Sequence, residues 1–178
     1  MFSLKKTKIE DCYLLDPPIY EDKRGLFVKS FHKSSLMNLG LCADFKEDFF
    51  SISKKGVIRG LHMAKSPSDH FKTVTCLSGE VLDVIIDLRV GSQTFGQCES
   101  FVLNEVNRRI LYIGKGIAHG FLSKAENTLL YYKVTSEYKV EDDIGVRWDS
   151  INFSWPIKKP TISERDSKFP TFEEFKSK

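Results

Sequence analysis

Apolar residues in this chain gather in short segments rich in β-branched side chains, and turn-forming residues separate them. Residues 81–88 mix alternation with valine and isoleucine between two glycine-containing turns, which predicts a strand buried over most of its length. Residues 26–31 follow a turn at 22–25 and predict another strand. Further short strands are predicted at residues 57–62, 109–113 and 129–134. Serial short strands of this kind are typical of a β-sandwich or barrel.

Helical periodicity is scarce. Residues 33–39 predict one or two helical turns that end at Gly40. Residues 171–176 predict a short helix capped by Thr171. There is no internal repeat and no linker, so residues 1–178 are expected to form a single all-β domain with a few short helices.

Charge and composition narrow the function classes. The 27 basic and 24 acidic residues leave a net charge of only +3, with no basic block, which argues against nucleic-acid binding but permits a local phosphate site. No apolar run reaches the roughly 18 residues of a membrane span. The first residues resemble no signal peptide, and the four cysteines form no CxxC motif. We therefore expect a cytoplasmic protein with reduced thiols that binds no membrane.

Several ionisable or polar side chains interrupt the apolar segments. Buried strands carry such groups mainly where they are paired or functional, and alternate residues of a barrel strand point inward. These side chains are therefore expected to converge at a ligand site near the mouth of the barrel. They are Arg59, His62, Lys72, His119 and Tyr132.

Each of these residues also has a structural interpretation. Taken singly, His62 suits a hydrogen-bonded strand position, His119 a tight turn, Lys72 an exposed strand start and Tyr132 a packing position. Arg59 is different, because an arginine in an apolar strand needs an anionic partner. Surface positions are the default expectation for the remaining candidates, His32, His70 and Asp166.

A set of short motifs runs through nearly the whole chain in one order. The motifs occupy residues 22–27, 55–62, 79–84, 87–89, 91–96, 118–121, 132–133, 144–149, 155–156 and 162–166. In these motifs the chain resembles the dTDP-4-dehydrorhamnose 3,5-epimerases. The resemblance implies a cupin-type jelly-roll β-sandwich, a homodimer, and catalysis without a metal or another cofactor.

The resemblance also implies roles for individual residues. His62 matches the general base and Asp166 the carboxylate that orients it. Lys72 matches the lysine beside the sugar ketone, and Tyr132 the general acid on the opposite face of the ring. This assignment agrees with the chemistry, since a neutral imidazole is a suitable base near pH 7 and an ammonium group stabilises an enolate.

The expected substrate is a nucleotide-diphosphate sugar with a ketone at C4. Arg24 and Arg59 match contacts to the diphosphate, for which guanidinium groups are well suited. Phe27 matches an aromatic residue near the nucleotide, and His119 a further active-site histidine. Tyr138 is expected to form part of the wall of the site.

The positions expected to contact the base depart from the family pattern. Lys29 stands where the family usually has glutamate. Glu47 and Phe49 stand at the ends of a Gln-Asp-Asn segment, and neither side chain can donate a hydrogen bond there. A base other than thymine therefore remains open. Changes at residues 63–64 and 67–72 also leave open epimerisation at C3 only or at C5 only.

Two other function classes remain as alternatives. The altered base positions are compatible with a cupin that binds a sugar nucleotide without catalysis. A metal-dependent cupin isomerase or oxygenase is disfavoured, because Met63-Ala64 follow His62 where metal cupins have a His-x-His pair. A serine hydrolase is disfavoured because the chain has no Gly-x-Ser-x-Gly motif.

Overall fold

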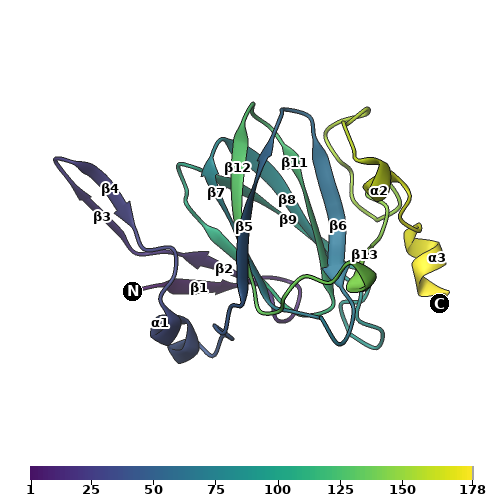
Figure 1. Ribbon diagram of the computed structural model, residues 1–178, viewed down its shortest axis with the longest axis horizontal. Helices are drawn as coiled ribbons and strands as arrows, with labels where there is room; N and C mark the ends of the chain where they lie inside the picture. The colour runs from purple at the N-terminus through teal and green to yellow at the C-terminus, as the bar shows by residue number, and fades with distance from the viewer. Residues whose placement is uncertain (178) are drawn as a thin grey trace.

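Two facing antiparallel β-sheets form the body of the protein in the computed structural model, which describes residues 1–177 (Figure 1). The larger sheet consists, in spatial order, of β1 (Ser3–Lys6), β2 (Tyr13–Asp16), β10 (Ile110–Ile113), β7 (Lys72–Ser78), β12 (Thr128–Val134) and β5 (Glu47–Ser53). The smaller sheet consists of β13 (Asp143–Gly145), β6 (Ile58–Ala64), β11 (Ile117–Ser123), β8 (Glu80–Asp87) and β9 (Cys98–Asn104). This arrangement confirms the prediction of an all-β sandwich.

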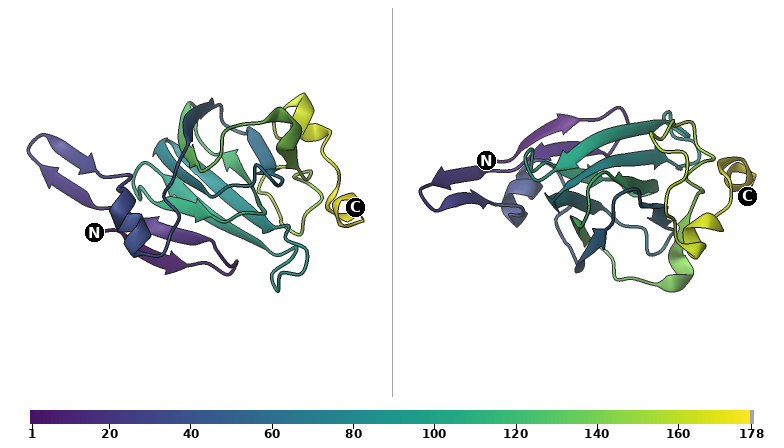
Figure 2. Two further views of the ribbon diagram at one scale, coloured as in Figure 1. Left: turned by 60° about the horizontal axis from the view of Figure 1, so that its bottom comes forward. Right: turned by 90° about the horizontal axis from the view of Figure 1, so that it is seen from above.

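A separate hairpin of β3 (Ile19–Asp22) and β4 (Gly25–Val28) projects away from the sandwich, at the end opposite the C-terminal helices (Figures 1 and 2). The helical elements are α1 (Lys33–Asn38), the 3₁₀ turn η1 (Val140–Asp142), α2 (Glu164–Ser167) and α3 (Phe172–Lys176).

Both predicted helices are confirmed. The helix α1 is followed by Gly40 at φ +78°, a conformation that glycine adopts without steric cost. Thr171 caps α3 in a capping box, in which its hydroxyl accepts from the Glu174 amide while the Glu174 carboxylate accepts from the Thr171 amide. No helix within residues 1–177 is long and apolar enough to cross a membrane.

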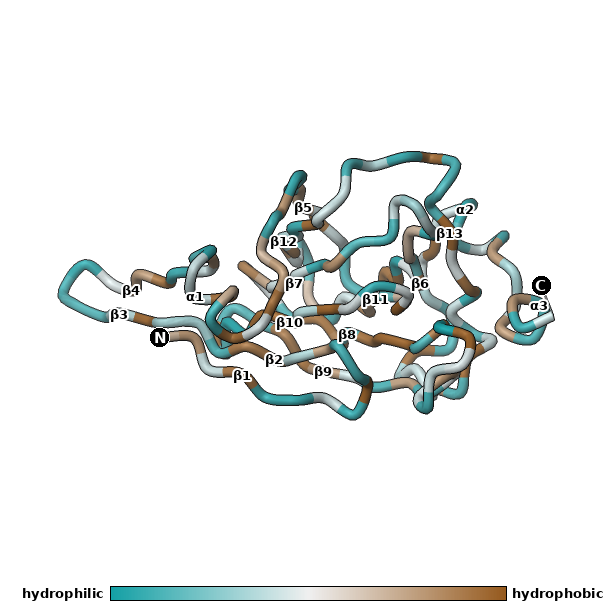
Figure 3. The backbone as a smooth tube through the Cα atoms, turned by 90° about the horizontal axis from the view of Figure 1, so that it is seen from below, coloured by the Kyte–Doolittle hydropathy of each residue, from teal (hydrophilic) through white to brown (hydrophobic). Residues whose placement is uncertain are grey.

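The core lies between the two sheets, where hydrophobic stretches of the central strands face each other (Figure 3). Val74, Leu111 and Leu130 of the larger sheet pack against Val81 and Ile85 of the smaller sheet. The predicted burial of residues 81–88 is confirmed, because both faces of β8 are covered. Val81 and Ile85 face the core between the sheets, and Val84 and Ile86 face away from it. Those side chains pack in a second cluster with residues of the C-terminal segment such as Ile151, Phe153, Trp155 and Phe172.

This packing carries the C-terminal segment back to β6. A parallel bridge joins Val57 to Thr161, and the Ile58 amide donates to the Thr161 carbonyl at 3.0 Å. The helix α2 therefore begins beside β6, and residues about a hundred positions apart in the sequence become neighbours.

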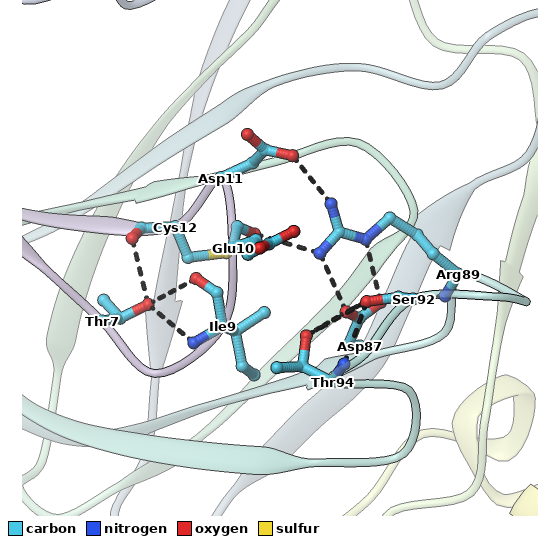
Figure 4. A network of polar contacts seen from close by, with 9 residues as sticks. All are labelled: Thr7, Ile9, Glu10, Asp11, Cys12, Asp87, Arg89, Ser92 and Thr94. Carbon is cyan, nitrogen blue, oxygen red and sulfur yellow. Dashed lines mark hydrogen bonds and ion pairs between the residues drawn. The ribbon is translucent and has the colours of Figure 1, made fainter.

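A buried polar network closes the end of β8 (Figure 4). Asp87 accepts hydrogen bonds from Arg89, Ser92 and Thr94, and Arg89 reaches on to Asp11 at 2.8 Å. Burial alone would raise the pKa of Asp87, but the hydrogen bonds from Arg89, Thr94 and Ser92 lower it to about 2. The ionised carboxylate thus ties the loop after β8 to the N-terminal segment through Arg89.

Candidate active site

A cavity of about 450 Å³ opens between the two sheets. The smaller sheet contributes His62 from β6 and His119 from β11, and the larger sheet contributes Lys72 from β7 and Tyr132 from β12. The structure therefore brings together most of the residues predicted from the sequence. The predicted residues that line this cavity are Glu47, Phe49, Arg59, His62, Lys72, His119, Tyr132 and Tyr138.

His62 and Asp166 form a dyad. The imidazole Nε2 lies 2.9 Å from Oδ1 of Asp166, and Oδ2 of the same carboxylate accepts the Gly60 amide at 2.9 Å. Asp166 is only 2% exposed, so the expectation of a solvated charge is wrong. The reason is that Ser163 caps α2 through the Asp166 amide and turns the carboxylate toward β6.

The electrostatics of the dyad suit a base. Burial opposes ionisation of Asp166, but hydrogen bonds from His62 and Gly60 hold the pKa of its carboxyl well below its usual range. Burial lowers the pKa of His62 below 6.5, although Asp166 acts in the opposite direction. At neutral pH the dyad therefore consists of an ionised carboxylate and a neutral imidazole that is ready to accept a proton.

Lys72 lies in the cavity rather than on the surface, so its default interpretation as an exposed lysine is wrong. It begins β7, the central strand pairing with both β10 and β12. Burial lowers its pKa to about 8, while the charges of Asp143 and Asp83 oppose that shift. The amine is thus close to the balance between its charged and neutral forms at physiological pH.

Tyr132 faces the cavity from the opposite sheet to His62. It is 6% exposed, its hydroxyl lies 3.2 Å from Ser51 Oγ, and its ring stacks on Phe49 at 4.8 Å with an interplanar angle of 18°. Burial raises the pKa of Tyr132 above its ordinary value of 10, so the phenol keeps its proton at neutral pH. A protonated phenol in a defined position is a suitable general acid.

His119 belongs to a second buried pair that the sequence reasoning missed. His119 lies opposite His62 in the β6–β11 register, and its Nε2 is 2.8 Å from Asp83 Oδ2. Asp83 is fully buried, and burial raises its pKa. Its Oδ1 has no hydrogen-bond partner within residues 1–177. The sequence signal was present, because a carboxylate alternating with apolar residues of a core strand must have a polar neighbour.

Arg59 and Glu47 both line the cavity, and they differ in the groups to which they hydrogen-bond. Arg59 donates to two neutral oxygens, Ser53 Oγ at 3.0 Å and the Ile52 carbonyl at 3.2 Å, which leaves its charge available to an anionic ligand. Glu47 accepts the Tyr138 amide at 2.9 Å. The side chain of Tyr138 is 61% exposed at the rim.

Four predicted residues do not line this cavity, namely Asp166, which contacts His62, and three residues in or beside the hairpin. Arg24 and Phe27 belong to the projecting hairpin, where they line a separate hollow with Tyr20, Asp22 and Leu26. The Arg24 guanidinium is 85% exposed and pairs with Asp22 at 2.6 Å. Lys29 follows the hairpin and is exposed.

His70, expected at the surface, instead lines the cavity. Its Nδ1 lies 2.9 Å from Ser136 Oγ, and burial lowers its pKa to about 4, so it is neutral at physiological pH. The other histidine expected at the surface, His32, is exposed. Within the described part of the chain, no group of three or more His, Cys, Asp or Glu side chains could hold a metal ion. Catalysis without a metal stays a prediction.

Comparisons with a family model and with known proteins give the same family description. Residues 6–174 match the family model described as dTDP-4-dehydrorhamnose 3,5-epimerase. The protein of that name from Shigella flexneri is 37% identical over 164 residues, covering 90% of this chain and 91% of its own length.

Solved structures agree with that match. The dTDP-4-dehydrorhamnose 3,5-epimerase of Bacillus anthracis, with TDP and PPi bound, has a TM-score of 0.94 and 36% identity, covering 97% of this chain and 100% of that one. The dTDP-6-deoxy-D-glucose-3,5-epimerase of Legionella pneumophila, in complex with dTDP-4-keto-L-rhamnose, has a TM-score of 0.92 and 34% identity, covering 97% and 94%. The likeness extends over the whole sandwich and confirms the expected jelly-roll fold of the cupin type.

Proposed function

The chain belongs to the dTDP-4-dehydrorhamnose 3,5-epimerase family, and from this premise we propose how its own residues invert C3, C5 or both of a nucleotide-diphospho-4-keto-6-deoxysugar. The observation that carries the proposal is the placement of His62 and Tyr132 on opposite sheets across one cavity. A sugar ring held between the sheets has a base on one face and an acid on the other.

The first step is removal of a proton from the carbon beside the ketone. The neutral imidazole of His62 takes this proton, and the electron pair of the broken C–H bond moves onto O4 as an enolate. Asp166 stabilises the imidazolium that forms and fixes the orientation of the ring. The ammonium group of Lys72 supplies the positive charge that the enolate oxygen needs.

The second step returns a proton to the same carbon from the other face. The Tyr132 phenol donates it, the enolate collapses back to the ketone, and the configuration of that carbon is inverted. Because C3 and C5 both flank the C4 ketone, the same two residues serve either carbon if the ring is reoriented in the cavity. No redox change occurs, so the reaction needs no redox cofactor.

Incubation with 4-keto sugar nucleotides in heavy water tests this function. We expect deuterium at the inverted carbon, and its distribution between C3 and C5 separates double from single epimerisation. Substrates with thymine, cytosine and guanine bases test the effect of Glu47 and Phe49 on the choice of base. Absence of exchange with all three bases, together with retained binding, would favour the sugar-nucleotide-binding alternative.

The pH dependence should report on Lys72. The protonated amine is the working form, and its pKa is lowered to about 8, so kcat/KM should decline as the pH rises through about 8. The K72R variant should be slower but should lack this decline, because a guanidinium group keeps its charge up to about pH 12. A decline that is identical in K72R would assign it to another group. The measurement is the initial rate of epimerisation between pH 6 and pH 10.

We also propose that the active unit is a homodimer. The outer face of edge strand β5 exposes Phe50 and Ile52, and the projecting hairpin exposes Leu26 and Phe27. An edge strand and a hairpin with exposed apolar side chains are typical of surfaces covered by another chain. Arg24 and Phe27 would then serve the cavity of the neighbouring subunit.

Mixing two inactive variants distinguishes this arrangement. Subunits with His62→Asn and subunits with Arg24→Ala should each be impaired, the second through weaker binding of the diphosphate. If the hairpin serves the partner's cavity, a mixed dimer has one intact site, and an equal mixture should regain about a quarter of the wild-type activity. No recovery in a mixture shown to contain hybrid dimers would mean that each hairpin serves its own subunit.

For the compartment we propose the cytoplasm. All four cysteines are free thiols, as is usual for proteins kept under reducing conditions. Nucleotide sugars as substrates fit the same compartment.

A further inference from the structure

Arg165 links the dyad to Asp143 at the start of β13, the strand that pairs with β6. Its Nη2 lies 2.8 Å from His62 Nε2, its Nε lies 3.3 Å from Asp166 Oδ1, and its Nη1 pairs with Asp143. The guanidinium group also lies over the Phe169 ring, 5.7 Å from its centre. Asp143 and Phe169 therefore hold this cation beside the imidazole.

The contacts at Nε2 of His62 cannot all be made at once. A guanidinium group only donates, so Arg165 needs a lone pair on Nε2, whereas Asp166 only accepts and needs a proton there. With Asp166 as partner, Nδ1 carries the lone pair that accepts the substrate proton. With Arg165 as partner, the proton lies on Nδ1 instead. Arg165 therefore competes with Asp166 for the same nitrogen.

Burial disfavours the protonated imidazole, whereas the negative charge of Asp166 favours it. The positive charges of Arg165 and Lys72 disfavour the protonated form as well. The titratable groups of the elements packed against His62 are Arg165 and Asp166 of α2, Lys72 of β7, His119 of β11, which pairs with Asp83 of β8, and Asp143 of β13.

We propose that Arg165 is a positioning residue, which keeps the His62 imidazole neutral and governs which of its nitrogens carries the proton. The role in catalysis rests on the proposed function of His62 as the base, but the effect on the ring is a property of the protein alone. When the imidazole takes up a proton, Nε2 can no longer accept, and the ring then donates to Asp166. Arg165 thus opposes protonation in the resting site without blocking it during the reaction.

Titration of the histidine ring by nuclear magnetic resonance tests the proposal without substrate. Only four histidines are present, so His62 is assigned by its disappearance in His62→Asn. In Arg165→Met the pKa of His62 should rise by about one unit, the lower end of the shift that a neighbouring charge produces. The proton should also move toward Nε2, which the ring ¹⁵N shifts report directly. Arg165→Lys should restore most of the wild-type pKa.

A matched control separates a local effect from the loss of one charge. Arg109→Met removes a cation that pairs with Asp16 on the larger sheet, and it should leave the His62 pKa unchanged. A merely structural role would lower the thermal midpoint of Arg165→Met and leave the titration of His62 in place. An unmoved His62 pKa in folded Arg165→Met would overturn the proposal.

The activity profile then connects the ring to the reaction. The acidic limb of kcat/KM should move to higher pH in Arg165→Met by the same amount as the measured pKa. If Arg165→Met shifts the His62 pKa as expected but the wild-type protein exchanges no deuterium with any substrate, the proposed function alone is contradicted. An active wild-type enzyme with an unmoved titration would contradict the Arg165 proposal alone.

Discussion

Replacing His62 with asparagine should lower both deuterium exchange and epimerisation by about 10²- to 10⁴-fold, the contribution of a positioned general base. Asparagine is preferred to alanine, since it keeps a polar side chain near the buried carboxylate of Asp166, which also retains the Gly60 amide as a partner. The loss should appear in kcat, while the dissociation constant for substrate changes little. The measurement combines exchange followed by nuclear magnetic resonance with direct titration of substrate binding.

The exposed His32 offers a control for this substitution. His32→Asn should retain wild-type exchange, because its exposed ring bonds to Ser35 and does not line the cavity. Exchange in folded His62→Asn at more than about a tenth of the wild-type rate would contradict the assignment of His62 as the base.

Replacing Tyr132 with phenylalanine should separate exchange from inversion. The variant keeps the stacked ring against Phe49 but loses the phenol, so His62 can still remove a proton and return one to the same face. Epimerised product should therefore fall by about 10²- to 10⁴-fold, while exchange with heavy water falls much less. The expected product is deuterated sugar of unchanged configuration, which coupling constants of the ring protons identify.

The neighbouring tyrosine provides a matched control. Tyr131 points its hydroxyl to Asp48 at 2.8 Å and does not line the cavity, so Tyr131→Phe should leave both rates near the wild-type values. Equal losses of exchange and inversion in Tyr132→Phe would show that the phenol acts in proton removal, contrary to the proposed roles.

Local sequence patterns predicted those strands and helices that are determined by neighbouring residues in the sequence. The burial of 81–88 follows from a run of apolar and β-branched residues, and the C-terminal helix was predicted from its cap, Thr171. The strand β11 was missed because it contains Gly120, which weakens a strand pattern. The structure explains that glycine, since a Cβ there would lie 2.7 Å from the Arg59 carbonyl.

The candidate site divides in a similar way. His62, Lys72 and Tyr132 were predicted from polar residues in apolar strands together with the family resemblance, and the structure gathers them in one cavity. Arg165 was missed because its neighbours in the sequence are polar, and only the fold brings it to His62. The position of Arg24 and Phe27 could not be predicted from strand patterns. Such patterns predict a strand but do not show whether it joins a sheet of the sandwich or projects from it.

The distance in sequence between the two members of the dyad has a consequence for how the enzyme fluctuates. The segment that carries Asp166 is held to β6 by the short bridge at Thr161, by the bonds of Asp166 to Gly60 and His62, and by the contact of Arg165 with His62. Such a segment can detach at a lower free energy than global unfolding requires. The sandwich then persists while the imidazole is without its carboxylate. The exchange rate of the single amide proton of Gly60 thus measures the fraction of time for which a folded molecule holds His62 without its carboxylate partner.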